Sequence, residues 1–425
     1  MCAPSWPTSP IAPCLDPPFR GRDARATRRE TFESLEPPPW YDGTRLRGEV
    51  EVVTAFGETD PYTLGVEEEF QILDPDDFGL VSRADEILGK GTDYEENLRT
   101  ELFQAVVETA SDVCQDVDEV REEVHRLRRG LADVIEDKGY KIAAAGTHPF
   151  ALWEDQDHTE SDRYEDLIDE VGWPARRDLI FGLHVHVAVR NPGEAIYVNN
   201  HIRPFLPLVL ALSANSPFWQ AEETGLMATR TRIFDAMPRT GMPTRFANWT
   251  DFTQTLERLK AVGSIEDVTR IWWDTRPRPD LGTVEIRMAD LPTDPRITIA
   301  LTALIQALVV RLSRAHRAGE QPPVRHEADI IEENRWRAIK DGIHAEFIQY
   351  DNVDGVERMP IDRVLSSTID HLAEVPRELG IKEELSLLVD RAERSEAGAD
   401  RQLAVREREG SLQAVAGDLA DRTVP

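Results

Sequence analysis

The stretch of sequence that decides the fold is Tyr62-Thr-Leu-Gly-Val-Glu-Glu-Glu-Phe-Gln-Ile-Leu73. Apolar and polar side chains alternate after Gly65, which is the period of a β-strand with one packed face. The opposite face carries Glu67 and Glu69, whose carboxylates repel each other unless a cation compensates them. Mg²⁺ and Mn²⁺ prefer carboxylate oxygens, so the pattern indicates either a metal site or a solvated outer face. Glu68 falls on the apolar face and fits neither interpretation.

Two later segments repeat this alternation. One carries His184 and His186 opposite a row of apolar residues, and the other carries Glu285 and Arg287 opposite another such row. A lone His-x-His pair is more often structural or a pair of zinc ligands. If all three strands belong to one sheet, however, that sheet has a packed back and a charged front that can bind metal.

Length and charge limit the class of protein. A chain of 425 residues with 40% apolar content can bury a large core in one big domain or in two to three ordinary ones. The net charge of −30 excludes non-specific binding to nucleic acid, which needs the opposite sign. The acid excess is typical of a halophile-like surface, because high salt screens its self-repulsion. Lysine is scarce among the 49 basic residues. This scarcity fits the same kind of surface, but a base composition that favours arginine codons would also explain it.

The sequence also predicts the compartment. No run reaches the roughly 18 apolar residues of a membrane helix, and we expect the most apolar pattern, Ile297–Leu312, to be a buried core helix. The three cysteines, two of them at positions 2 and 14, exclude a disulfide framework. The N-terminus lacks the pattern of a secretory signal. We therefore expect a cytoplasmic protein with no membrane partner.

The chain divides into three parts by pattern. Residues 1–58 are rich in Pro and Arg without periodicity, which predicts a disordered extension or a start codon placed too early. Residues 59–380 interleave strands and helices, and 381–425 form a charged helical tail. Strands early and helices late predict an α+β fold around a curved, largely antiparallel sheet with helices packed on its back. Within it we expect a helix at 332–348.

Six segments, in order, resemble motifs of the glutamate–cysteine ligase type 2 family, whose members are also called ATP-dependent carboxylate–amine ligases. They are Gly65-Val-Glu-Glu-Glu-Phe-Gln, Gly146-Thr-His-Pro, Gly182-Leu-His-Val-His-Val, Leu212-Ser-Ala-Asn-Ser-Pro-Phe-Trp, Ile271-Trp-Trp-Asp-Thr-Arg and Glu285-Ile-Arg. The match runs from about Thr63 to Ala345, some two-thirds of the chain, and six collinear blocks make it specific.

The resemblance implies a glutamine-synthetase-like catalytic domain whose concave sheet face holds ATP and two or three Mg²⁺ ions. The metal ligands that it implies are Glu67, Glu69, Glu101, Glu108, His184 and Glu285. Glu101 stands where the family commonly has Asp, and the choice between His184 and His186 is open. Arg287 is similar to an arginine that contacts the ATP phosphates, so it is the expected nucleotide-binding residue and, with Glu67, the expected catalytic one.

Three further residues are substrate-binding candidates. Arg230 and Arg232 would form a carboxylate clamp if their segment is extended, or else a surface pair. His148 would line the amine site or hold a turn. The two tryptophans of the Trp272-Trp273 pair are assigned to the core. A Walker-type phosphate-binding loop is absent from the sequence.

The activity implied by the resemblance joins the γ-carboxylate of glutamate to the amine of cysteine, weakly, as in glutathione biosynthesis. The route is a γ-glutamyl phosphate intermediate, with ADP and phosphate released. Alternatives are a γ-glutamyl ligase for a different amine, a two-metal hydrolase using Glu67 with both histidines, and a non-catalytic acidic binding protein. The partners are small molecules, with no nucleic acid, and the sequence leaves the oligomeric state, including a homodimer, open.

Overall fold

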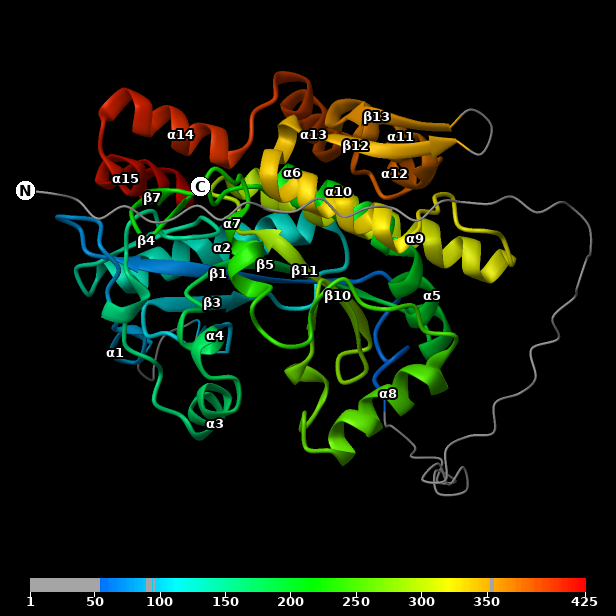
Figure 1. The fold of residues 1–425 in the computed structure, drawn as a ribbon, viewed down its shortest axis with the longest axis horizontal. Helices are drawn as coiled ribbons and strands as arrows, with labels where there is room; N and C mark the ends of the chain where they lie inside the picture. Colours follow the sequence, from blue (N-terminus) through cyan, green and yellow to red (C-terminus); the bar gives the residue numbers. More distant parts are fainter. Residues whose placement is uncertain (1–53, 89–93, 95, 352–354) are drawn as a thin grey trace, which may run out of the picture. The chain divides into compact units, whose positions relative to one another are not determined.

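The stretch that begins at Tyr62 contains strand β1 (Leu64–Leu73), the central strand of a seven-stranded antiparallel sheet in the computed structural model (Figure 1). The sheet order is β10-β11-β5-β1-β3-β2, and β4 pairs with the second half of β1. The structure describes residues 54–88, 94, 96–351 and 355–425. The other strands of the sheet are β2 (Leu98–Thr100), β3 (Val106–Ala110), β4 (Lys141–Ala143), β5 (Gly182–Ala188), β10 (Thr275–Arg278) and β11 (Thr283–Asp290).

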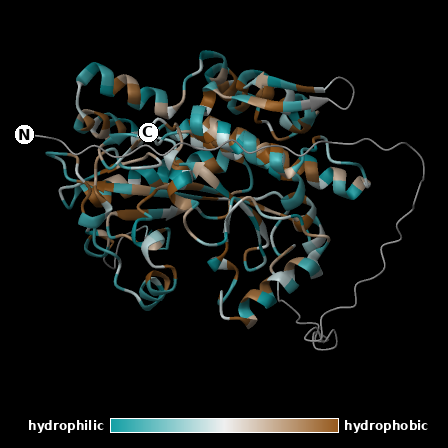
Figure 2. Ribbon diagram, viewed as in Figure 1, coloured by the Kyte–Doolittle hydropathy of each residue, from teal (hydrophilic) through white to brown (hydrophobic). Residues whose placement is uncertain are grey.

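The apolar face of the sheet packs against a layer of helices. This layer contains α2 (Val117–Glu136), α5 (Pro192–Ile202), α6 (Leu206–Ser213) and α9 (Pro295–Ala318). Figure 2 shows hydrophobic segments on the strands, whereas the outer helix α14 (Gly398–Glu409) is mostly hydrophilic. The α+β class with an antiparallel sheet and helices on its back is confirmed.

Helix α9 contains the apolar pattern that predicts a core helix, and this prediction is confirmed. It is the one helix among the described residues that is long and apolar enough to cross a membrane, yet 89% of its most apolar window is buried inside the protein. Asp294 caps its first turn, and Gly319 with φ +65° ends it.

Smaller elements surround this framework. The helices are α1 (Ala84–Ile87), α3 (Asp162–Val171), α4 (Trp173–Arg176), α7 (Thr229–Phe234), α8 (Trp249–Ala261), α10 (Ala328–Asp341), α11 (Ile361–Leu372), α12 (Val375–Glu378), α13 (Lys382–Arg394) and α15 (Leu412–Thr423). Single 3₁₀ turns are η1 (Trp153–Asp155), η2 (Arg203–Phe205), η3 (Val268–Arg270) and η4 (Gly342–His344). The short strands are β6 (Phe218–Trp219), β7 (Glu222–Glu223), β8 (Thr240–Gly241), β9 (Trp272–Trp273), β12 (Glu346–Asp351) and β13 (Gly355–Pro360).

The buried carboxylate on the apolar face of β1 has its counter-charge. Glu68 accepts hydrogen bonds from Nε and Nη2 of Arg128 on α2, and from the hydroxyl of Thr298 at 2.8 Å. Arg128 is fully buried and also donates to the carbonyls of Thr293 and Thr423. One ion pair therefore joins the central strand to α2, α9 and the C-terminal helix α15.

The helix predicted at 332–348 is wrong in its second half. Helix α10 ends at Asp341, and Gly342 at φ +53° turns the chain. The residues from Glu346 onward form β12, which pairs with β13. The turn at Gly342 requires a positive φ that glycine supplies at least cost.

The boundaries of the domain differ from the expectation at both ends. Ala55 donates a backbone hydrogen bond to Pro279, and the ring of Phe56 packs edge-on against Trp249, so packed structure begins before residue 59. Residues 381–425 form α13, α14 and α15; α13 packs on α9 and α15 on β4, and Val52–Pro425 is one compact unit. The predictions for residues 1–53 lie outside the described residues.

Candidate active site

Cross-strand pairing brings charged residues from four strands onto the front face of the sheet, opposite the helix layer. The paired positions are Glu69 with Glu108, Glu67 with His184, and His186 with Glu285. Residues directly opposite each other in antiparallel strands have neighbouring side chains. The register therefore creates the cluster from residues that are far apart in sequence.

The side chains of this cluster form three groups that could hold a metal ion. Within each group the candidate ligand atoms lie within 4.8 Å of one another. The groups are Glu67, Glu108 and His184; Glu67, His186 and Glu285; and Glu69, Glu101 and Glu108. The structure thus brings together all seven residues that the sequence suggests as metal ligands, and both histidines take part.

The donor set fits a divalent cation. Nδ1 of His184 lies 3.0 Å from Oε2 of Glu67, and Nδ1 of His186 lies 3.0 Å from the hydroxyl of Thr283. Both Nε2 atoms are buried, and neither has a hydrogen-bond partner among the described residues. A buried polar atom without a partner is costly, whereas a metal-bound histidine holds its second nitrogen in this kind of hydrogen bond.

The pKa values of the carboxylates in this cluster also favour a bound cation. Burial, together with the charges of Glu69 and Glu67, raises the pKa of Glu101 to about 7. Burial and the same neighbours raise the pKa of Glu108 well above its ordinary value. Burial also pushes the pKa of Glu67 upward, but the adjacent histidines outweigh it and hold this pKa well below the ordinary value. The cluster has more negative charge than its own side chains compensate, which a divalent cation would relieve.

Glu285 is enclosed by arginines at the β10–β11 side of the cluster. Its carboxylate is paired with Arg276, with Arg287 at 2.8 Å and with Arg278 at 3.4 Å. Burial raises the pKa of Glu285, but these arginines outweigh it and hold the pKa well below its ordinary value. As a metal ligand Glu285 would share its oxygens with guanidinium groups. Arg276 ends the motif Ile271-Trp-Trp-Asp-Thr-Arg, but nothing in the sequence pattern indicates its pairing with Glu285.

A β-bulge in β11 positions Arg287. The pairing of β11 with β5 shifts register between Ile286 and Ala289, at the position of Arg287. Bulges of this kind re-aim side chains near active sites. Arg287 lines a cavity of about 110 Å³ beside the carboxylate–histidine cluster, and its buried Nε has no hydrogen-bond partner among the described residues.

This space, which we call the front cavity, adjoins the carboxylates at Glu69 and Glu101. Its other polar lining residues are Arg163, Tyr164, Asp178, Arg230, Thr269, Arg270 and Arg287, and its apolar ones include Leu102, Phe103, Leu167, Phe234, Met237 and Trp272. Sequence patterns missed Asp178, which lies in a loop. Burial raises its pKa to about 7, and the charge of Glu69 acts in the same direction against the lowering effect of Arg230.

The expected clamp of two arginines is not formed. Their segment is helix α7 rather than extended chain, and residues two apart on a helix point in different directions. Arg230 is buried and lines the front cavity, whereas Arg232 is half exposed and ion-pairs with Asp235 at 2.9 Å. An added Cβ at Gly182 would collide with the Arg230 guanidinium, so this glycine makes room for it.

His148 holds a turn. Its Nε2 donates to the carbonyl of Phe78 at 2.9 Å, and its Nδ1 accepts from the amide of Ala151 at 2.9 Å. Burial lowers its pKa to about 4, and it does not line the front cavity. Trp272 packs, partly buried, against a hydrophobic core cluster and also lines the front cavity, while Trp273 packs against Phe246.

Comparison with known proteins agrees with this geometry. Residues 63–418 match the model of glutamate–cysteine ligase family 2. A Rubrobacter xylanophilus protein assigned to glutamate–cysteine ligase 2-3 is 41% identical over 87% of this chain and 99% of its own. A glutamate–cysteine ligase of Haloquadratum walsbyi is 41% identical over 67% of this chain and 80% of its own.

Solved structures show a shared fold. The glutamate–cysteine ligase of Francisella tularensis, in complex with AMP, superposes with a TM-score of 0.62 over 86% of this chain and 89% of its own, at 13% identity. The match to the family model covers most of the chain, and the similarity to curated relatives extends over nearly all of a relative's length. The chain therefore belongs to glutamate–cysteine ligase family 2 and is a ligase of this type.

Proposed function

We propose that the protein is an ATP-dependent carboxylate–amine ligase. It converts the γ-carboxylate of glutamate to γ-glutamyl phosphate and then transfers the γ-glutamyl group to the amine of cysteine. The observation that carries the proposal is the position of three carboxylate-rich ligand groups directly beside a cavity that holds Arg230 and Arg287. The names of the relatives supply glutamate and cysteine as the first substrates to test.

Phosphoryl transfer from ATP requires the protein to neutralise the charge of the phosphates more than to form covalent bonds with them. A carboxylate attacks the γ-phosphorus of ATP and ADP leaves; the amine then attacks the acyl carbon and phosphate leaves. Mg²⁺ bound by the carboxylate–histidine cluster would neutralise the triphosphate. Arg287 contributes a planar guanidinium beside the cluster, where it can stabilise charge on the transferring phosphoryl group.

Two residues of the front cavity suit the carbon–nitrogen step. Arg230 is buried, and its Nε has no hydrogen-bond partner among the described residues, so it can bind a substrate carboxylate. The amine must lose a proton as it attacks. Asp178 has a pKa near the operating pH, which suits a general base, and one of its oxygens is buried without a partner in the described part of the chain.

An oxygen-transfer experiment tests the proposal. Glutamate labelled with ¹⁸O in its γ-carboxylate is incubated with ATP, Mg²⁺ and cysteine, and the released phosphate is analysed by mass spectrometry. We expect one ¹⁸O atom in each phosphate formed, because the carboxylate oxygen becomes the bridge of the acyl phosphate. Turnover that yields unlabelled phosphate would contradict this route.

A second candidate is the same chemistry with a different amine. The apolar and aromatic part of the front-cavity wall, which includes Phe234, Met237 and Trp272, favours an acceptor with an apolar portion. Parallel reactions with a panel of amines, each compared with cysteine by kcat/KM, separate the two candidates. The amine with the highest value is the assigned substrate.

A further inference from the structure

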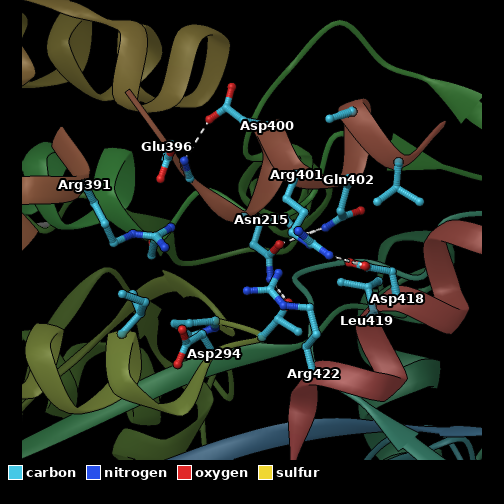
Figure 3. A pocket seen from close by; sticks show the side chains of 18 of the residues that line it. Asn215, Asp294, Arg391, Glu396, Asp400, Arg401, Gln402, Asp418, Leu419 and Arg422 are labelled. Carbon is cyan, nitrogen blue, oxygen red and sulfur yellow. Dashed lines mark hydrogen bonds and ion pairs between the residues drawn. The ribbon is translucent and has the colours of Figure 1, made fainter. Parts of the chain in front are cut away.

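A second cavity, of about 370 Å³, lies where α13, α14 and α15 meet the end of α6 and the start of α9 (Figure 3). We call it the back pocket. It shares no lining residue with the front cavity. Its volume falls within the range of small-molecule sites, and the active-site chemistry makes no use of it.

Two arginines of the back pocket lack a direct counter-charge. Arg391 on α13 and Arg422 on α15 line it, and neither side chain has a hydrogen bond or an ion pair with any residue in the described ranges. Burial lowers the pKa of Arg391, although Asp294 and Glu396 act against this at longer range. A partly buried cation without a partner is costly, and this chain has a net charge of −30.

The acidic residues around the pocket do not supply the missing partners. Asp294 is paired with Arg296 and caps α9, and Asp400 is paired with the ring of His344 at 2.7 Å. Asp418 is paired with Arg401. The remaining carboxylate of the lining, that of Glu396, is exposed.

The rest of the lining suits an organic ligand. Apolar side chains come from Leu212, Ile297, Val405 and Leu419, and amide groups come from Asn215 and Gln402. Guanidinium groups match the planar geometry of carboxylate and phosphate. We propose that the back pocket binds a small organic anion, whose carboxylate or phosphate group pairs with Arg391 and Arg422, and that this anion regulates the active site.

A chain of hydrogen bonds gives the regulation a route. Gln402 donates to the side-chain and backbone oxygens of Asn215 at 2.8 Å, and the Asn215 amide donates to Asp290 at 2.8 Å. Ser216 donates to the same Asp290 oxygen and accepts from the amide of Arg230 at 3.1 Å. An occupant of the back pocket therefore contacts one end of a network whose other end positions a residue of the front cavity.

Calorimetry without ATP tests the site. The probes are citrate, which carries only carboxylates as its anionic groups, and glycerol 3-phosphate, which carries a phosphate. The probe that binds more tightly identifies the anionic group that the pocket prefers. We expect at least tenfold weaker binding in Arg391→Gln and in Arg422→Gln. Arg317→Gln, a control at an exposed arginine near the other end of α9, should bind as the wild type does.

A cavity-filling variant distinguishes loss of the binding site from misfolding of the arginine variants. Ala404→Trp fills the pocket without changing its charge, and we expect it to abolish binding while its melting temperature stays near that of the wild type. Absence of binding by both probes, or equal binding by wild type and the pocket variants, would overturn the site. Because ATP is absent, this outcome is independent of the proposed ligase reaction.

The regulatory role has its own measurement. With the bound probe at saturation, we expect the KM for glutamate in the ADP-release assay to change at least threefold in the wild type and to stay unchanged in Arg391→Gln. Binding with unchanged kinetics would overturn the regulatory role of the pocket.

Discussion

Adjacent carboxylates on β1 have opposite tasks. Glu67 lies on the front face within the carboxylate–histidine cluster, whereas Glu68 lies on the back and is ion-paired with Arg128. We expect Glu67→Gln to lower kcat by at least about 10²-fold, because a charged ligand is lost, while the melting temperature stays within a few degrees. Steady-state kinetics and thermal melting measure both quantities.

The matched control is Glu68→Gln. It leaves Arg128 without its buried counter-charge, which typically costs about 3–5 kcal/mol of stability. We expect this variant to melt at a much lower temperature. A stable, inactive Glu68→Gln, or an active Glu67→Gln, would contradict the division between the two faces.

Arg287 is expected to act on the transferring phosphoryl group. Arg287→Lys keeps the charge but loses the planar fork, so kcat should fall by about 10²-fold, roughly 3 kcal/mol, while the KM for ATP changes much less. Stability should change little, because Arg276 and Arg278 still pair with Glu285. A near-normal kcat with a lowered melting temperature would reduce Arg287 to a structural ion pair.

The carboxylate cluster predicts a pH dependence of metal binding. Glu101 has a pKa of about 7 in the folded, metal-free protein, above its unfolded value, so the folded state holds the proton more tightly. This group's contribution to stability is therefore present at low pH and is lost as the pH rises from about 4.5 through 7. Mg²⁺ binds the deprotonated carboxylate, so its Kd should fall about tenfold between pH 6 and pH 8.

Calorimetric titration of Mg²⁺ at several pH values provides the measurement. Glu101→Gln is the control, because it removes one carboxyl group that titrates in this range. We expect its Mg²⁺ affinity to be weaker and to vary less with pH. The same pH dependence in both proteins would show that a different group titrates.

At the scale of elements, a period of two identified the three strands that carry the cluster, and the family resemblance added Glu101 and Glu108. Alternation shows which face a side chain takes, but the register that puts Glu67 opposite His184 depends on the whole sheet. Asp178 could not be predicted, because a loop residue has no periodic pattern. Helix α7 was missed because six residues are too few for a helical period to appear.

The C-terminal helix α15 is an integral part of the core. Its Thr423 accepts from Arg128 through its carbonyl and from the amide of Ala144 through its hydroxyl. Deletion of residues 410–425 should therefore remove cooperative unfolding or lower the melting temperature by more than about 10 °C. Deletion of the exposed Pro425 alone is the control and should leave melting unchanged. An unchanged melting temperature in the variant that lacks residues 410–425 would show that α15 does not contribute to the stability of the domain.

At the scale of the whole molecule, the chain combines a net charge of −30 with a sheet face whose clustered carboxylates suit bound cations. The sequence predicted the fold class and the side of the sheet on which the charged cluster lies. It did not predict that residues 381–425 pack back onto the domain, because charged, amphipathic helices look alike whether they dock or extend. Contacts such as that between Arg128 and Thr423 join residues almost 300 positions apart.

A carboxylate–amine ligase consumes ATP only when a carboxylate and an amine are joined. ADP release by the purified protein is therefore measured with Mg²⁺ and KCl, with glutamate and cysteine supplied singly and together, and with Glu67→Gln as the inactive reference. We expect rapid ADP release only when both substrates are present, with one amide bond formed for each ADP, and no release above background by the variant. ADP release that is equal with either substrate alone, or amide formation without ATP, would exclude this reaction.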